Sequence, residues 1–190
     1  LMKCIDQYLY LHKINLTASI MKNNLASKKI FLHNDFFIYS EDQKFLYLER
    51  SFPNLKYKSV ELKDAHLLYE LLKKRKYSIS HKSLPSFKLH REFVKNHPYL
   101  FWFLIYEKNQ AIGSFYIKND NSIGINILQA TKQKLSLIIE YIKINFIPAK
   151  EIKSKIPPYF FINVPQDNYL LKYILKELNC SSIQTSFKFE

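Results

Sequence analysis

Three side chains in this sequence are suited by type to moving a proton: His81, His90 and Tyr116. An imidazole titrates near neutral pH, so either histidine is a candidate general base. Tyr116 stands in a run of strand-forming residues and could direct its hydroxyl into a cleft, although alternation along a strand equally allows core packing. Because the chain contains six histidines, an ordinary surface or packing role for His81 and His90 stays open.

Other kinds of active site require spacings that this sequence lacks. The two cysteines, Cys4 and Cys180, stand far apart, so neither a disulfide framework nor a cysteine zinc site is expected. His90 and His97 do not have the i, i+4 spacing of a helical zinc motif. The sequence also contains no Walker-type glycine loop, nucleophile elbow or dinucleotide fingerprint. We therefore expect no metal.

Composition favours a globular protein with one core and an appendage. Of 190 residues, 47% are hydrophobic and 24% charged, which is enough apolar material to offset chain entropy. The net charge of +13 would suit nucleic acid, but the lysines are scattered along the chain. The aromatic residues 101–103 lie in an apolar run typical of a buried strand. We expect no nucleic-acid partner, and an acidic partner or anionic substrate stays an alternative.

The sequence predicts no membrane segment. Its most apolar run, residues 99–106, is far shorter than the ~20 residues that cross a bilayer. Charged residues such as Lys3 and Asp6 interrupt the N-terminal region, which therefore lacks the apolar core of a signal peptide. Together with the low cysteine content, this favours a cytoplasmic location.

The elements that must position the candidate residues follow from hydrophobic periodicity and turn signals. Residues 1–55 predict an N-terminal extension, with a helical or irregular segment and then a hairpin of strands at 36–39 and 44–49. Residues 56–190 predict a mixed α/β domain. Its expected strands are 57–60, 99–107, 111–118, 122–128, 159–164 and 183–189, and its expected helices are 62–72, 87–94, 131–146 and 168–178.

The three central strands, within residues 99–128, should form an antiparallel meander because short polar turns join them. Gly113 and Gly124 fall inside the second and third of these strands. A glycine weakens a strand, so each predicts a bulge or a close approach of another group to the backbone.

The order of elements over residues 56–190 resembles the fold of the GCN5-related N-acetyltransferases. The stretches AIGSFYI at 111–117 and SIGINI at 122–127 resemble the third and fourth strands of that family, and FINV at 161–164 resembles the fifth strand. Residues 80–102, with Trp102 at their end, resemble the approach to the central sheet in some bacterial sugar and small-molecule acetyltransferases. The resemblance implies an acyl-CoA N-acyltransferase fold and places His81 and His90 beside the acceptor.

The resemblance also implies a site for acetyl-CoA and none for a metal. The pantetheine arm would meet Ile125, Asn126 and Ile127 on the fourth strand. Asn168 would contact the cofactor, although it could equally cap the helix that follows. The residues implied for the pyrophosphate loop are Gln129, Thr131, Lys132, Gln133 and Lys134, with the two lysines adding positive charge.

Three departures from the family pattern weaken the catalytic interpretation. The family's pyrophosphate loop carries spaced glycines, which residues 129–134 lack. Leu175 stands where many members hold a tyrosine that protonates the departing thiolate. No carboxylate occurs between residues 122 and 128 to serve as a base.

Two hypotheses follow. In the first, the protein transfers an acetyl group from acetyl-CoA to an amine of a small molecule, such as an amino sugar or metabolite. In the alternative, it is a non-catalytic binding or interaction module that keeps this fold. For the N-terminal extension we expect packing beside the sheet or support of a homodimer.

Overall fold

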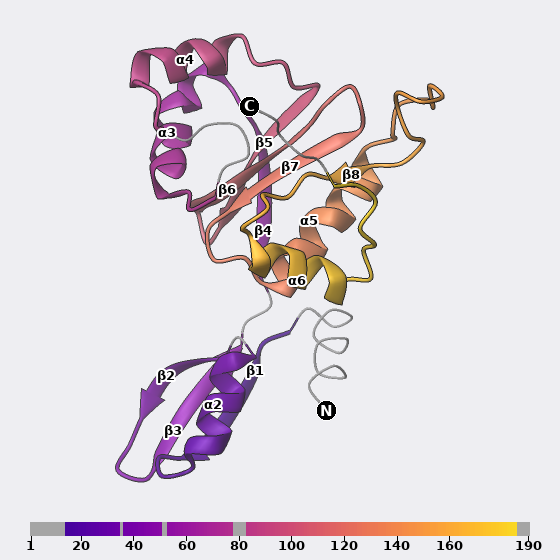
Figure 1. Ribbon diagram of the computed structural model, residues 1–190. Helices are drawn as coiled ribbons and strands as arrows, with labels where there is room; N and C mark the ends of the chain where they lie inside the picture. The colour runs from indigo at the N-terminus through magenta and orange to yellow at the C-terminus, as the bar shows by residue number, and fades with distance from the viewer. Residues whose placement is uncertain (1–13, 35, 51–52, 78–82, 186–190) are drawn as a thin grey trace. The chain divides into compact units, whose positions relative to one another are not determined.

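The computed structural model describes residues 14–34, 36–50, 53–77 and 83–185 (Figure 1). The chain divides into two compact units, Leu1–Asn54 and Leu55–Glu190. None of the helices that the structure describes has the length and apolar character that crossing a bilayer requires. Each unit is described by itself below.

The first unit is a three-stranded antiparallel sheet with one helix. Its elements are β1 (Leu16–Met21), α2 (Leu25–His33), β2 (Phe37–Glu41) and β3 (Phe45–Arg50), and β3 lies between β1 and β2. A small core contains Ile20, Phe36, Leu46 and Leu48. The hairpin of β2 and β3 agrees with the sequence. The expectation of a helical or irregular segment was wrong for β1, whose period-two alternation of Leu16, Ala18 and Ile20 was the available signal.

The second unit is built on a five-stranded sheet in the order β4-β5-β6-β7-β8 (Figure 1). The strands are β4 (Leu55–Ser59), β5 (Phe101–Glu107), β6 (Gln110–Ile117), β7 (Ser122–Ile127) and β8 (Phe161–Ile162). Strands β4 to β7 pair antiparallel, which confirms the predicted meander, whereas β7 and β8 pair parallel. Of the final strand predicted over 183–189, residues 183–185 have no regular structure and the others lie outside the described residues.

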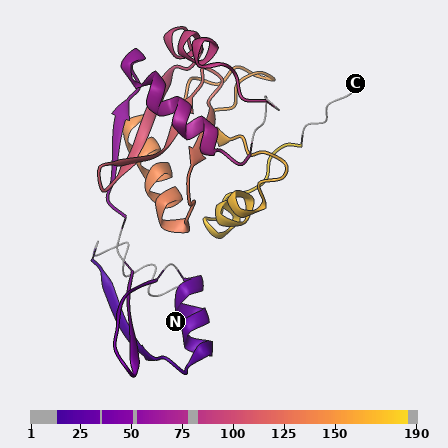
Figure 2. The ribbon, with the colours of Figure 1, turned by 90° about the vertical axis from the view of Figure 1, so that its left-hand side faces the viewer.

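Helices cover both faces of this sheet (Figures 1 and 2). The short helix η1 (Leu62–Asp64) leads into α3 (Ala65–Lys74), and α3 and α4 (Phe87–Lys95) cover one face, where Leu68, Val94 and Leu104 are buried. Helices α5 (Lys132–Asn145) and α6 (Tyr169–Glu177) cover the other. The buried residues of that second core are Ile105, Phe115, Ile117, Ile123, Leu135, Ile138, Ile142, Leu171, Ile174 and Leu175.

Asn121, in the turn between β6 and β7, fixes the long connection from α5 to β8. It is 2% exposed and has a left-handed backbone with φ of 66°. Its side-chain amide donates to the carbonyls of Ala149 at 3.0 Å and Pro157 at 2.7 Å, and its Oδ1 accepts from the Ala149 amide at 2.7 Å. Its own carbonyl accepts from the Phe161 amide at 3.2 Å. One side chain therefore ties the connection to the start of both β7 and β8.

Candidate functional site

Strands β7 and β8 separate after a short stretch of pairing. Ser122 lies opposite Phe161 and Ile123 opposite Ile162, and the last bond between the strands runs from the Asn163 amide to the Ile123 carbonyl at 3.0 Å. Among the described residues, no pairing with β8 extends beyond that bond. We call Gly124 and Ile125 the splay point and residues 125–127 the open edge of β7.

The backbone of the open edge directs hydrogen-bonding groups into the gap. The carbonyls of Asn121 and Ile123 point toward β8, whereas Gly124 and Asn126 pair with β6 on the other side. Backbone groups alternate sides along a strand, so the N–H and C=O groups of Ile125 and Ile127 face the gap. The side chains of Ile125 and Ile127 pack against the core under α5 and α6. Backbone groups rather than side chains therefore define this edge.

Gly113 confirms the predicted close approach. A Cβ at this position would overlap the Asn126 carbonyl and lie 2.8 Å from the Ile127 Cα. The register of β5 and β6 shifts between Ile105 and Tyr106, next to the partner of Gly113. Because Gly113 has no side chain, the backbone of β6 packs directly against the backbone of Asn126 and Ile127 in the open edge of β7.

Gly124 makes room for Tyr116. The two residues are register partners across β6 and β7, and a Cβ on Gly124 would overlap the Cζ and the hydroxyl of Tyr116. Tyr116 is half-buried and packs on the α3 and α4 face. Since Gly124 is the first residue after the last pair with β8, the Tyr116 hydroxyl lies at the splay point.

Tyr99 stacks on Tyr116 with ring centroids 3.9 Å apart and an angle of 4° between the ring planes. Burial raises the pKa of both phenols. The positive charge of Arg75 lowers both pKa values, and the interaction between the two hydroxyls raises the pKa of Tyr99 while lowering that of Tyr116. Tyr116 is thus the more acidic member of a pair that stays protonated at neutral pH.

Residues 128–134, which we call the α5 turn, comprise the connection after β7 and the first residues of α5. Gln129 is left-handed with φ of 53°, a conformation that favours glycine. Thr131 caps α5 by accepting from the Lys134 amide at 3.3 Å. The first amides of α5 therefore begin where the open edge of β7 ends, as an anion site at a helix N-terminus requires.

Both lysines of this turn form ion pairs with carboxylates. Lys134 Nζ lies 2.8 Å from Glu107 Oε2, and 11% of the lysine side chain is exposed. Lys132 Nζ lies 3.7 Å from Glu177 Oε2, and about a third of each side chain is exposed. The positive charge expected from Lys132 and Lys134 is therefore paired with carboxylates. Gln133 follows in the same turn and is half-buried.

The remaining predicted residues take structural positions or lie outside the description. Asn168 caps α6, with its Oδ1 accepting from the Leu171 amide at 3.1 Å. His90 is 7% exposed between α3 and α4, its ring 5.3 Å from Tyr69, and burial lowers its pKa. His81 lies outside the described residues. Leu175 is 8% exposed in the core beneath α6.

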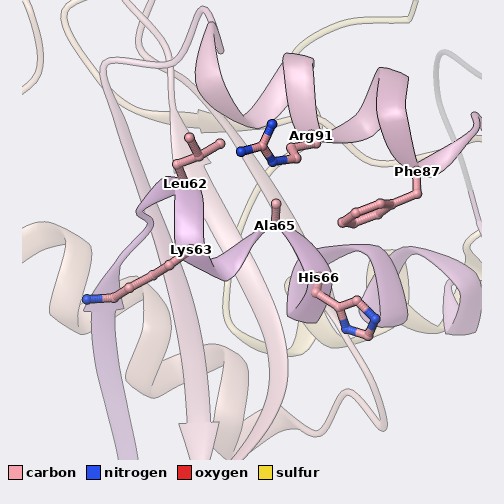
Figure 3. Close-up of a pocket in the computed structure, with 6 residues that line it drawn as sticks. All are labelled: Leu62, Lys63, Ala65, His66, Phe87 and Arg91. Atoms are coloured by element: carbon pink, nitrogen blue, oxygen red, sulfur yellow. The ribbon is translucent and has the colours of Figure 1, made fainter.

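A separate hollow of about 390 Å³ lies between η1, α3 and α4. Figure 3 shows Leu62, Ala65 and Phe87 around it, with the Arg91 side chain reaching across it. None of its lining residues belongs to β6, β7, β8 or α5. This hollow is therefore distinct from the splay point.

Sequence reasoning missed Tyr99, Glu107 and Glu177 as parts of the site. Tyr99 was assigned to the start of a strand and to the stretch that resembles the approach to the central sheet, but not to the site. The two glutamates come from β5 and α6, far from the α5 turn in sequence. A stacked pair or a long-range ion pair leaves no local pattern to detect. The aromatic run around Tyr99 was the one available signal, and it predicted a buried strand instead.

The sequence matches no protein-family model and no curated protein. Among solved structures, it is similar to a domain from Methanocaldococcus jannaschii DSM 2661 at 14% identity and a TM-score of 0.51, over 70% of this chain and 92% of that one. It is also similar to aminoglycoside N-acetyltransferase AAC(6')-Iy in complex with CoA, at 10% identity and a TM-score of 0.50, over 73% of this chain and 95% of that one. At these identities the likeness shows the fold alone, and it confirms the GCN5-related N-acetyltransferase fold and the mixed α/β class.

Proposed function

We propose, from the acetyltransferase fold of this chain, that the protein transfers an acetyl group from acetyl-CoA to an amine of a small molecule, an amino sugar or another metabolite. The open edge of β7 carries the proposal. Among the described residues, the N–H and C=O groups of Ile125 and Ile127 have no partner in β8, which has turned away from β7. An extended arm that contains amides, such as pantetheine, can pair with such an edge as an added strand would.

The site offers more free groups to the pantetheine arm of acetyl-CoA than to its pyrophosphate. The pantetheine arm would lie along residues 125–127, where backbone groups are available. The pyrophosphate would meet the first amides of α5, at Lys132, with the Lys132 and Lys134 side chains held by Glu177 and Glu107. We therefore infer that the arm contributes most of the binding energy.

The chain supplies a donor for the charge that develops during transfer. The bound donor would supply the thioester, and an attacking amine places negative charge on its carbonyl oxygen. The Ile125 N–H lies at the splay point and has no partner in β8 among the described residues, so it can hydrogen-bond to that oxygen. His90, buried between two helices, and His81 stay untested as bases.

The ion pairs at the α5 turn favour a second candidate, a non-catalytic module with the same fold. Lys134 is tied to Glu107 in a loop that lacks the family's glycines, while Leu175 is buried where the resemblance implies a catalytic tyrosine. A chain with no use for the donor could keep both features. Direct binding separates the two candidates.

Donor binding can be measured by thermal shift with acetyl-CoA and with free CoA. A ligand at about 100 times its Kd adds roughly 2.7 kcal/mol of stability, so a clear rise in Tm is expected. The variant Ile125→Pro removes an N–H that faces the gap without breaking the ladder to β6, and we expect about a tenfold loss of affinity from one lost hydrogen bond. Ile125→Val keeps that N–H and serves as the control. Absence of any shift at millimolar ligand would favour the non-catalytic module.

A further inference from the structure

Acyl transfer from a thioester leaves a sulfur that must acquire a proton, and α6 offers none at the expected position. Leu175 is 8% exposed and packs among Leu171, Ile174 and the residues of α5. On the same helix, Tyr169 and Tyr173 are 75% and 62% exposed, so both point away from the core that Leu175 faces. If the chain is active, the proton comes from another element or from solvent.

Tyr116 brings a hydroxyl to the splay point from the opposite face of the sheet. It belongs to β6, and its ring reaches across to Gly124, which a Cβ would make impossible. The first backbone groups free to hold a thioester belong to the next residue, Ile125. The hydroxyl therefore lies where the reacting end of an arm bound along β7 would lie.

The surroundings of Tyr116 favour release of its proton over that of its neighbour. Tyr99 stacks on it at 3.9 Å, and the interaction between the hydroxyls raises the pKa of Tyr99 while lowering that of Tyr116. Arg75 adds a positive charge that lowers both pKa values, and Lys118 Nζ lies 5.9 Å from the Tyr116 ring centroid. Burial, the strongest influence on Tyr116, and the negative charge of Asp120 raise its pKa, so that on balance the pKa of Tyr116 lies above that of an ordinary phenol.

We propose that Tyr116 is the catalytic acid that protonates the leaving sulfur, and that Tyr99 is a positioning residue that stabilises its phenolate. The inference rests on the proposed function. As the amine nitrogen bonds to the carbonyl carbon and the carbon–sulfur bond breaks, the Tyr116 Oη–H proton passes to sulfur. The phenolate that remains accepts a hydrogen bond from the Tyr99 hydroxyl. The amine loses one proton to solvent, and Tyr116 regains one, so the protons balance.

The first test needs no acceptor, because it follows ionisation of the thiol of bound CoA by ultraviolet absorbance. A phenol that hydrogen-bonds to the thiolate lowers the pKa of that thiol, so Tyr116→Phe should raise it by about one unit. Tyr99→Phe should raise it by less. The matched control is Tyr57→Phe, because the Tyr57 hydroxyl is buried on the other face of the sheet and has no partner among the described residues. That control should leave the thiol pKa unchanged.

The second test measures release of free thiol from acetyl-CoA with glucosamine as the probe amine. Removal of a general acid typically costs between about 10² and 10⁴ in rate, so Tyr116→Phe should lose at least 10²-fold in kcat while KM for acetyl-CoA changes little. A thermal melt of each variant, with and without CoA, verifies folding and donor binding.

The outcomes separate this inference from the proposed function. If the unaltered protein shows no thermal shift with CoA, the proposed function fails and the catalytic acid with it. If the unaltered protein binds CoA but Tyr116→Phe shifts neither the thiol pKa nor kcat, only the role of Tyr116 is overturned. Equal effects of Tyr57→Phe and Tyr116→Phe would also overturn it, because they would indicate general damage to the sheet.

Discussion

The two ends of the candidate donor site differ in what holds them. Around the splay point and the open edge of β7, Gly113 and Gly124 keep the backbone accessible, the Ile125 backbone faces the gap, and the Tyr116 hydroxyl lies over Gly124. At the α5 turn, Lys132 and Lys134 are paired with Glu177 and Glu107. One end presents groups to a ligand, whereas the other satisfies its own charges.

The difference teaches that the thioester end and the anionic end of a donor can be selected independently. At the splay point, the close approach of Tyr116 to the backbone requires a glycine at position 124. At the α5 turn, a carboxylate can pair with each lysine without altering the strand or the helix. Under the proposed function, a chain could therefore keep the groups that face the thioester while its affinity for the pyrophosphate falls.

The largest expected effect comes from filling the space at the splay point. Gly124→Ala places a methyl group inside the Tyr116 ring, and overpacking at such a site costs about 3 kcal/mol, at the upper end of its usual range. Denaturant unfolding measures the loss. Tyr116→Ala serves as the control, because it removes the ring that the new methyl group would meet. The double variant Gly124→Ala with Tyr116→Ala should therefore lose less stability than the two single losses added together. Additive effects would show that Gly124 and Tyr116 are not coupled.

An intermediate effect is expected at the α5 turn, and a pair of matched variants measures it. Lys134→Met leaves the Glu107 carboxylate, 23% exposed, without its partner. We expect the free energy of unfolding to fall by about 1.5 kcal/mol, which is less than for a fully buried pair because solvent screens the exposed part of the carboxylate. Lys132→Met breaks a longer and more exposed pair, which should cost no more than about 0.5 kcal/mol. Both values come from urea unfolding. Adding Glu107→Gln to Lys134→Met should restore most of the loss, and no restoration would show that the charges are not the cause.

The smallest effect tests the comparison most directly. If the arm supplies most of the affinity, S-acetyl-pantetheine should bind within tenfold of acetyl-CoA, a difference below about 1.4 kcal/mol. Isothermal titration at two salt concentrations measures both ligands, and the affinity for acetyl-CoA should change little with salt because the lysines are already paired. A hundredfold preference for acetyl-CoA would show that the α5 turn binds pyrophosphate strongly.

Sequence alone predicted the framework better than the site. The helices and strands between residues 55 and 178 follow hydrophobic periods and turn signals, and Gly113 and Gly124 correctly predicted close approaches. The strand β1 was missed because small and polar residues alternate there with few large apolar ones. A glycine within a strand predicts that another group approaches the backbone there, but only the structure identifies Tyr116 as the group that approaches Gly124.

Paired charges lay beyond sequence reasoning for a related physical reason. The family resemblance implied that Lys134 adds positive charge to a pyrophosphate loop, yet Glu107 reaches it from the end of β5. The same holds for Asn168, whose type suited both a ligand contact and a cap until the helix fixed its side chain. Residue type predicts what a group can do, and three-dimensional contacts decide whether the group is already engaged.

The hydrogen bonds of Asn121 fix the end of the sheet from which β7 and β8 begin to separate. It anchors the chain on the way into β8 and also receives the Phe161 amide where that strand begins. The far ends of β7 and β8 diverge from this fixed corner, so a small rotation there becomes a larger displacement at residue 127. Under the proposed function, substitutions in the 146–160 segment would alter the width of the gap without changing a residue of the open edge.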